Sequence, residues 1–157
     1  MQDIDRVPII IRREIEALIA VPLINAFIET FGREPALEVT HAVIRSLAGQ
    51  AGELLQMVAQ GNALEQLRQA FALFSQAGAL EFQVLEANPS KASINVTRCK
   101  YAEMYRKHGL EEFGSLLSCG RDFAFMEGLN PTIRLTRTQT IMQGAAFCDF
   151  RFSIGEG

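Results

Sequence analysis

Apolar positions in the first part of the chain recur at intervals of three or four residues, the period of an α-helix. The repeat ends at Gly32, a residue that commonly stops helices. Pro22 lies inside the repeat, so we expect the helix to kink there or to split in two. The charged residues within 12–16 are interpreted as a solvated helix face. The repeating apolar positions are Ile11, Ile15, Leu18, Ile19, Leu23, Phe27 and Phe31.

Two further helices follow in the first half. Pro35 suits the first turn of the second helix, and Gly49 and Gly52 fall inside it. These glycines either weaken the helix or let a neighbouring element approach closely. Asn62 with Glu65 three residues later forms the capping-box pattern that starts a third helix. The apolar face of the second helix is formed by Val39, Ala42, Val43, Leu47, Leu54, Leu55 and Val58.

The apolar period changes from helical to two after Gly78. Alternation over residues 80–84 predicts a half-buried strand, and Asn88-Pro89-Ser90 is typical of a turn. Alternation resumes over residues 92–97. The two segments together predict a β-hairpin.

Two more helices and two more strands complete the expected order. The helices are predicted over about residues 99–108 and 111–126. A third strand is predicted from Pro131 through Thr140, and a turn at Gln143-Gly144 leads into a fourth over residues 147–154. Short connections favour antiparallel pairing.

These elements predict one α+β domain over residues 1–157. N-terminal helices occupy about residues 1–78. An antiparallel four-stranded sheet, with two helices inserted between its hairpins, occupies about residues 79–157 and carries the candidate site. At 157 residues the chain is long enough to bury a substantial core.

Composition narrows the classes of partner and compartment. A net charge of -3 argues against nucleic acid, which favours a basic surface. No apolar run is long and uncharged enough to cross a bilayer, and the opening residues lack the pattern of a signal peptide. The three cysteines are an odd number and widely spaced, so we expect reduced thiols in the cytoplasm.

Strand parity singles out Arg137 in the last third of the chain. In the predicted third strand Ile133 and Leu135 define an apolar face, and Arg137 shares it. A buried guanidinium is costly unless it is paired. The pattern therefore predicts a structural carboxylate partner, a bulge that changes the register, or an anion-binding role, for which a guanidinium fork suits a carboxylate ligand.

Cys119 and Asp122 lie three residues apart on a predicted helix and so share one face. A carboxylate there can accept a proton or orient a water. It raises the pKa of a neighbouring thiol, and a cation such as Arg121 is needed to lower it. The alternative is a buried cysteine with a solvent-facing aspartate.

Cys148 is expected on the packed face of the fourth strand, where most cysteines are small buried hydrophobes. Cys148 could also ligate a divalent metal together with Cys119, Asp122 and a histidine. No zinc-binding spacing is present, however. We therefore expect no cofactor and assign no metal ligands. Whether the reaction needs a divalent metal stays open.

Four segments of the chain resemble the L-2-amino-thiazoline-4-carboxylic acid hydrolase family. They read CKYAE at 99–103, LLSCGRDF at 116–123, IRLTRTQT at 133–140 and CDFRF at 148–152. The opening helix up to Gly32 is also similar. The resemblance covers nearly the whole chain and is strongest in its last third.

The resemblance implies a bacterial hydrolase that opens the thiazoline ring of a small amino-acid-like substrate. The reaction that names the family yields N-carbamoyl-L-cysteine, on a microbial route to cysteine. Either Asp122 activates a water or Cys119 attacks the ring carbon directly, and the two residues are expected to act together. The expected substrate-binding residues are Arg137 and Arg134 for the carboxylate, Thr138 for a hydrogen bond and Cys148 in the pocket wall.

Two other classes of function stay open from the sequence. One is a non-catalytic domain that senses a small molecule or a metal. The other is a structural or interaction subunit. A buried Arg137 argues against that class, because a scaffold has no need of a buried charge. The oligomeric state also stays open, with a homodimer as the commonest assembly of small enzymes.

Overall fold

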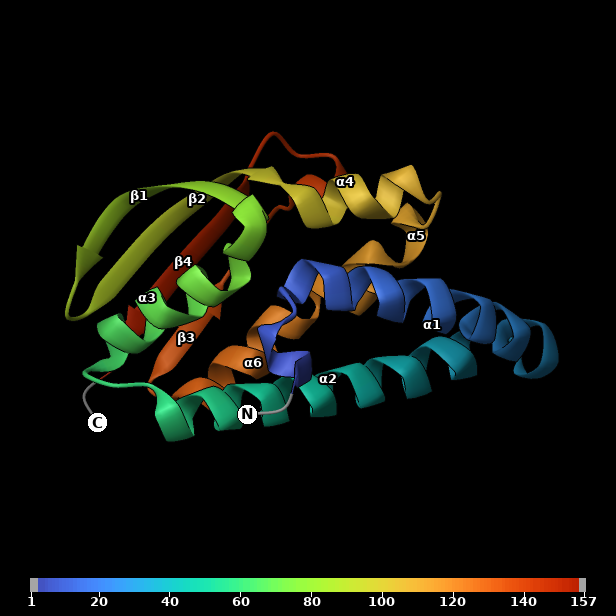
Figure 1. Ribbon diagram of the computed structural model, residues 1–157, viewed down its shortest axis with the longest axis horizontal. Coiled ribbons are helices and arrows are strands. Elements are labelled where there is room, and N and C mark those ends of the chain that lie inside the picture. Colours follow the sequence, from blue (N-terminus) through green and yellow to red (C-terminus); the bar gives the residue numbers. More distant parts are fainter. Residues whose placement is uncertain (1–2, 156–157) are drawn as a thin grey trace.

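The computed structural model describes residues 3–155 and shows a helical hairpin beside a sheet covered by further helices (Figure 1). The α-helices are α1 (Ile9–Phe31), α2 (Arg33–Val58), α3 (Ala63–Phe74), α4 (Lys100–Lys107), α5 (Glu111–Gly114) and α6 (Arg121–Leu129). The short helical turns are η1 (Asp3–Arg6), η2 (Gln76–Gly78), η3 (Ser115–Cys119) and η4 (Ile141–Gln143). The strands are β1 (Leu80–Asn88), β2 (Lys91–Cys99), β3 (Ile133–Thr136) and β4 (Cys148–Ile154).

The strands form one antiparallel sheet in the order β1-β2-β4-β3. The predicted α+β class is confirmed, as are the helices inserted between the two strand pairs. One face of the sheet packs on α3 and α6, and Phe71 of α3 contacts both Phe150 and Phe152 of β4 edge-on. The alternation predicted for the fourth strand also holds, because Cys148, Phe150 and Phe152 are buried while the residues between them are less so.

β1 is more exposed than its alternation predicts. Apart from its two ends every residue of β1 is exposed, including Val84 at 55%. β1 is an edge strand, and its pairing with β2 is irregular between Glu81 and Phe82 and again between Val84 and Glu86. Such irregularities interrupt the alternation that places every second side chain in the core. The prediction of a half-buried strand is therefore wrong.

The predicted third strand is too long. β3 ends at Thr136, and residues 137–140 run on without strand pairing. The backbone N–H groups of Thr138 and Gln139 both donate to the Asp149 carboxylate at 2.9 and 2.8 Å. A side chain that captures backbone donors in this way competes with a strand ladder. Arg137 therefore leaves the sheet, and strand parity does not govern its direction.

The helix predicted over residues 111–126 is interrupted at its centre. η3 is a π-helical segment between α5 and α6, and the Gly120 N–H donates to the Ser115 carbonyl at 2.7 Å. Single π-turns inside helices are frequent at functional sites. Here the π-segment ends at Cys119, directly before the helix that carries Asp122.

Glycine lets the backbones of α2 and α6 touch. A Cβ added to Gly52 would lie 2.2 Å from the Phe125 carbonyl oxygen, and one added to Gly128 would lie 2.2 Å from the Gly49 carbonyl oxygen. Both positions therefore require glycine for steric reasons. The expectation that glycine admits a close neighbour is confirmed for Gly52, whereas a Cβ at Gly49 would lie at an ordinary 3.8 Å from the Ala124 carbonyl oxygen. On α6, Gly128 admits the Gly49 backbone.

The apolar stripe with helical spacing in α1 is the side that the fold leaves exposed. Its members, from Ile11 to Phe31, are between 42% and 65% exposed. The residues on the buried side are Ile9, Ile10, Ala17, Val21 and Ile24. α1 is continuous through Pro22, so of the two expected outcomes, a kink or a split, the split does not occur.

α2 has the same two-sided character. Val39, Val43, Leu47, Leu54 and Val58 are at least 48% exposed. The buried side is Ala36, Ile44, Ala48 and Gly52. Among the described residues no helix has both the length and the apolarity needed to span a bilayer.

Candidate active site

A buried ion pair joins Arg137 to Asp122 at the centre of the C-terminal half. Nη1 of Arg137 donates to Oδ2 of Asp122, and Nη2 donates to the Cys119 backbone carbonyl at 3.0 Å. The Arg137 side chain is 7% exposed and that of Asp122 is 24% exposed. The pair thus joins the segment 119–122 to Arg137, which lies 15 residues after Asp122, and it leaves the Asp122 side chain partly exposed.

Two aromatic rings hold the Arg137 guanidinium in place. Its central carbon lies 5.2 Å from the ring centroid of Phe123 and 5.1 Å from that of Phe150. Arginine favours such stacking on aromatic faces. With both terminal nitrogens donating hydrogen bonds to the protein, Arg137 fixes the orientation of Asp122.

The environment of Asp122 shifts the pKa of its carboxyl upward. Burial raises the pKa of Asp122 above its ordinary value, and the charge and hydrogen bond of Arg137 offset part of the rise. Arg13 and Arg121 oppose the rise more weakly from a greater effective distance. A carboxyl whose pKa moves toward neutrality is suited to exchange protons during a reaction.

All three cysteines lie close enough to this carboxyl to interact with it electrostatically. They come from the end of β2, the end of η3 and the start of β4, and all three are free thiols. Burial raises the pKa of Cys99 to about 11, and it raises that of Cys119 well above its ordinary value with a further contribution from Asp122. Burial also raises the pKa of Cys148. The thiols are therefore protonated at neutral pH.

Cys148 has a defined place in the site wall. Its Sγ accepts a hydrogen bond from the Ile141 N–H at 3.2 Å, and the residue is buried at the start of β4. This fits the small buried hydrophobe expected from strand parity. It also places the thiol against the turn that follows the Arg137 segment.

Charged residues of α1 reach the same region, which corrects their interpretation as a solvated face. Arg13 donates to both carboxylate oxygens of Glu16 at 2.8 and 2.7 Å. Arg121 of α6 donates to Glu16 at 3.2 Å and, through Nε, to the Leu117 carbonyl at 2.6 Å. On the same helix Glu14 lies 2.6 Å from His108. α1 is thus tied to the helix of Asp122 by a polar network.

Arg12 adds a further cation on the inner side of α1. Its Nε is buried and has no hydrogen-bond partner among the described residues. Burial lowers the pKa of Arg121 on α6 to about 10, which still leaves it charged at neutral pH. Arg137, Arg13 and Arg121 all act electrostatically on Asp122, so its surroundings are rich in positive charge, a setting that favours an anionic ligand.

Thr138 and Arg134 lie apart from the ion pair. Thr138 Oγ1 donates to Oδ2 of Asp149 at 2.6 Å, so its hydroxyl is used within the protein. Arg134 is on the exposed face of β3, where it borders a shallow hollow shared with Thr132 and Ser153. The structure brings Cys119, Asp122, Arg137 and Cys148 together, and these two residues do not join them.

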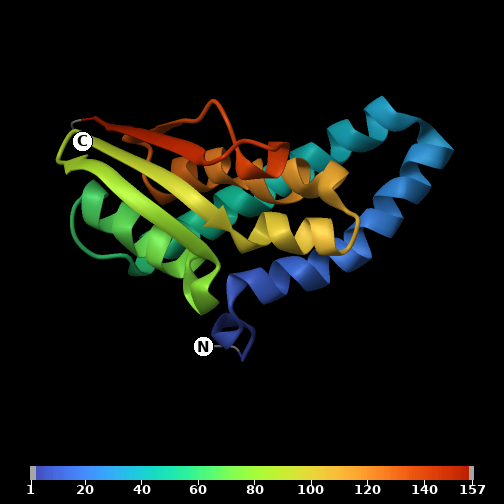
Figure 2. The ribbon, with the colours of Figure 1, turned by 90° about the horizontal axis from the view of Figure 1, so that it is seen from above.

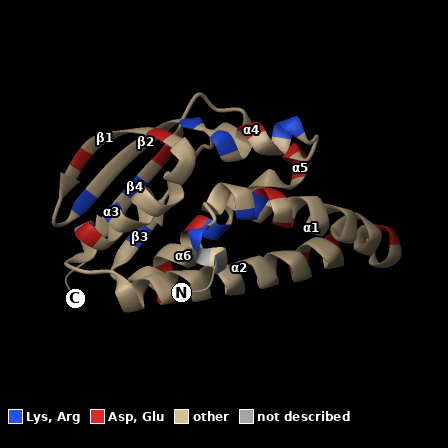
Figure 3. Ribbon diagram, in the orientation of Figure 1, with Lys and Arg blue, Asp and Glu red and all other residues tan. Residues whose placement is uncertain are grey.

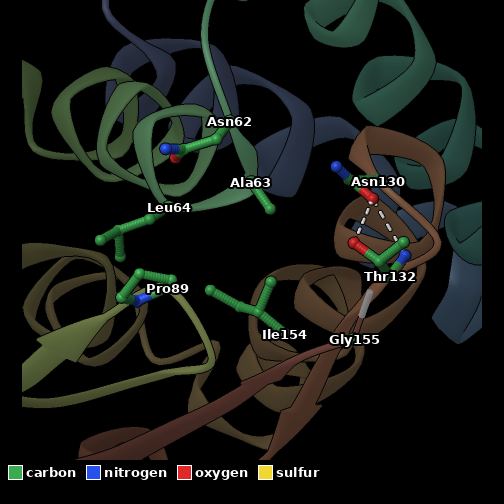
Figure 4. Close-up of a pocket in the computed structure, with 8 residues that line it drawn as sticks. All are labelled: Asn62, Ala63, Leu64, Pro89, Asn130, Thr132, Ile154 and Gly155. Carbon is green, nitrogen blue, oxygen red and sulfur yellow. Dashed lines mark hydrogen bonds between the residues drawn. The ribbon is translucent and has the colours of Figure 1, made fainter. Parts of the chain in front are cut away.

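A hollow elsewhere on the molecule carries no comparable chemistry. It has a volume of about 420 Å³ and lies between α3, the β1–β2 turn and the end of β4 (Figure 4). Asn130 Oδ1 accepts hydrogen bonds from both the N–H and the hydroxyl of Thr132, and Asn62 caps α3. The polar groups of this hollow thus serve the local fold, and its lining contains no titratable side chain.

The arrangement of ligating side chains does not suggest a metal centre. Within residues 3–155 no group of three or more histidine, cysteine, aspartate or glutamate side chains is placed to hold a metal ion. Of the two histidines in the chain, His108 pairs with Glu14. The reactive groups that the structure places at the site are a carboxyl, thiols and arginines.

The sequence of the chain matches the model of one protein family over residues 12–152, a span that includes the whole site. That family is described as L-2-amino-thiazoline-4-carboxylic acid hydrolase. The chain belongs to this family. The resemblance expected from the four C-terminal segments is thereby confirmed. The description of the family names a hydrolase reaction.

A solved structure shares the fold of this hydrolase family member. It is the crystal structure of the phenol-responsive sensory domain of the transcription activator PoxR with phenol, at a TM-score of 0.55 and 14% sequence identity. The match covers 85% of this chain and 71% of that chain. At this identity the likeness shows the fold alone. No sequence among the curated proteins matches the chain.

The sequence missed several members of the site for one reason: they lie far from Asp122 along the chain. Cys99 ends β2, and Arg13 and Glu16 belong to the first helix. The signal for Cys99 was its place in the CKYAE segment. For the α1 residues the signal was a block of charges inside an otherwise apolar helix, which is costly unless the charges are paired.

Proposed function

We propose that the protein is a hydrolase that opens a thiazoline-type ring in a small substrate carrying a carboxylate. The observation that carries this proposal is the Asp122 carboxyl, held by Arg137, partly accessible, and surrounded by protonated thiols. Membership of the family supports the reaction class. L-2-amino-thiazoline-4-carboxylate is the substrate proposed first, with N-carbamoyl-L-cysteine as its product.

The protonation states favour activated water over direct attack by a thiol. A nucleophilic cysteine requires a thiolate, which an adjacent cation stabilises. Around Cys119 burial and Asp122 outweigh Arg137 and hold the pKa above its ordinary value. We therefore assign Asp122 as the general base and Cys119 as a neutral neighbour that contacts the ring sulfur.

The proposed reaction needs one water and one carboxyl. The ring carbon between sulfur and the two nitrogens is electrophilic when the ring nitrogen is protonated. Asp122 takes a proton from water, whose oxygen bonds to that carbon, and the adduct then expels the sulfur as the carbon–sulfur bond breaks. The proton on Asp122 passes to the sulfur, which leaves as the free thiol of the product. The hydroxyl of the former adduct then loses its proton to solvent, which balances the proton first taken up by the ring nitrogen, and the urea carbonyl forms.

The arginines are proposed to recognise the substrate carboxylate. Arg137 stays the first candidate because it lies nearest to Asp122, although both of its terminal nitrogens are engaged by the protein. Arg121 and Arg13 are the next candidates, since both act electrostatically on Asp122. Arg134 and Thr138 are proposed only as an outer rim that the substrate meets on entry.

The test is turnover of L-2-amino-thiazoline-4-carboxylate, followed as newly formed thiol. Asp122→Asn is expected to lower kcat by about 10²–10⁴-fold, the usual contribution of a general base. Glu127→Gln, on the exposed side of the same helix, is the matched control and should retain full activity. Cys119→Ser should lower kcat only several-fold, whereas complete loss with a normal fold would transfer the attack to the thiol.

The second candidate is a domain that binds a small molecule without transforming it. The observation that favours it is the fold shared with a sensory domain whose solved structure contains phenol. Binding of the thiazoline detected by calorimetry, without release of thiol by wild-type protein, would favour this candidate. The three free thiols suit a reducing compartment, and we propose the cytoplasm with no nucleic-acid partner.

A further inference from the structure

The α1–α2 hairpin presents large apolar side chains to the outside along both of its helices. In Figure 2 it projects beyond the rest of the molecule at the end far from the sheet. On α1 the exposed residues recur every three or four positions as one stripe: Ile11, Ile15, Leu18, Ile19, Leu23, Phe27 and Phe31. On α2 the exposed residues are Val39, Val43, Leu47, Leu54, Met57 and Val58.

The outer stripe of α1 lacks the charges that mark a solvated helix. Residues 17–28 contain no charged side chain, and Figure 3 shows this part of α1 almost entirely in tan. The opposite side of the same stretch is buried through Ala17, Val21 and Ile24. A helix that is apolar all round is normally buried on all sides, so the outer side of α1 is built for a partner.

The exposed apolar area is larger than a monomer usually shows. At about half exposure and roughly 150–200 Å² a side chain, the α1 stripe offers on the order of 600 Å² and the α2 stripe a similar area. The largest apolar patch on a typical monomer is about 300–600 Å². A stable interface buries about 800 Å² on each partner, which the hairpin can supply.

We propose that the α1–α2 hairpin is the interface of a homodimer, in which the hairpins of two copies pack together through their outer apolar stripes. A second copy is the occupant because it brings an equally large apolar hairpin, as a two-fold interface requires. Two hairpins pack as four helices, a stable arrangement for apolar helical stripes. The inner side of α1 meanwhile keeps its contacts with Arg121.

The test is the mass of the full-length protein in solution, measured by sedimentation velocity over a series of concentrations. Wild-type protein is expected to be dimeric at micromolar concentration and to dissociate on dilution. Ile19→Glu and Leu23→Glu each place a charge in the centre of the stripe, and each should weaken the dimer by at least about 100-fold. Far-UV circular dichroism should show unchanged helix content in both variants.

A matched control separates this interface from any other apolar surface. Leu85 of β1 is 56% exposed, close to the values for Ile19 and Leu23. Leu85→Glu should leave the dimer intact. If Leu85→Glu dissociates the protein while Ile19→Glu does not, association occurs at the sheet edge and the proposal is wrong.

Two further outcomes would overturn the proposal. A wild-type protein that stays monomeric at about 100 µM, well above a micromolar dissociation constant, excludes the dimer. A monomer that sediments with phosphatidylglycerol vesicles would assign the hairpin to a lipid surface instead. If a glutamate variant fails to fold, the dimer is tested with Phe31→Gln at the end of the stripe and with the dilution series of the wild-type protein. Phe31→Gln should also weaken the dimer.

Discussion

The region around Asp122 and the outer side of the α1–α2 hairpin depart from the usual distribution of side chains in opposite directions. Around Asp122 an ion pair and three thiols lie inside the protein. On the hairpin, phenylalanine, leucine and isoleucine side chains lie outside. Buried charges and large exposed apolar patches are the informative exceptions in a globular protein.

The two exceptions cost stability in different ways. Arg137 and Asp122 lose hydration on folding, and their mutual attraction together with the Cys119 carbonyl and two aromatic rings offsets that loss. The exposed apolar side chains of the hairpin stay in contact with water in an isolated copy, so they add no stability from burial. A ligand can use the first region, and a partner chain can cover the second.

The largest expected change in stability comes from breaking the buried pair. Arg137→Ala leaves Asp122 without its partner and should lower the free energy of unfolding at pH 7 by about 3–5 kcal/mol, measured by urea denaturation. The loss should shrink as the pH falls, because protonated Asp122 needs no cation. The control is Arg134→Ala, three residues earlier on the exposed face of β3. It should change the free energy of unfolding by less than about 0.5 kcal/mol. A pH-independent loss would contradict the pairing.

A smaller change is expected where the Arg137 segment is anchored. Hydrogen bonds from Thr138 and Gln139 outweigh burial and hold the pKa of Asp149 below its ordinary value. A carboxylate with a lowered pKa stabilises the fold above its ordinary pKa, and this contribution is lost as the pH falls through about 4 and below. Asp149→Asn should therefore cost about 1–3 kcal/mol at pH 7 and much less at pH 3.

The control for Asp149 is Glu53→Gln, an exposed carboxylate on α2. It should leave urea denaturation unchanged at both pH values. Equal stability of Asp149→Asn and wild type at pH 7 would mean that the carboxylate does not hold residues 138 and 139.

The smallest change is expected on the outer side of the hairpin. Ile15→Gln should alter the unfolding free energy of dilute monomer by less than about 0.5 kcal/mol, since the side chain is already exposed. Val21→Gln, on the opposite and buried side of α1, should cost several times more. Equal costs for the two variants in dilute solution would show that both sides of α1 are covered within one chain.

Local patterns in the sequence predicted the elements well and their surroundings less well. Period-two alternation identified β4 with the correct inward side, because both of its neighbouring strands pair regularly with it. For α1 the periodicity predicted the helix, yet the larger apolar residues turned out to face outward. Periodicity reports which residues share a side of a helix, and it contains nothing about which side the rest of the chain covers.

The candidate site shows the same limit. Cys119 and Asp122 were identifiable because they lie three residues apart within one predicted helical segment. Their relation to Arg137 depended on where β3 ends, which Asp149 decides by hydrogen bonds across the loop. Cys99 and Arg13 join the site only through tertiary packing, so spacing along the chain could not reveal them.

The glycine contacts hold the backbones of α2 and α6 directly against each other. Because the α2 backbone at Gly49 and Gly52 touches the α6 backbone, no flexible side chain stands between the two helices to absorb a displacement. α2 bears an outer apolar stripe, and α6 bears Asp122. A displacement of α2 therefore has to be shared by α6, because no side chain at this contact can change its conformation to absorb it.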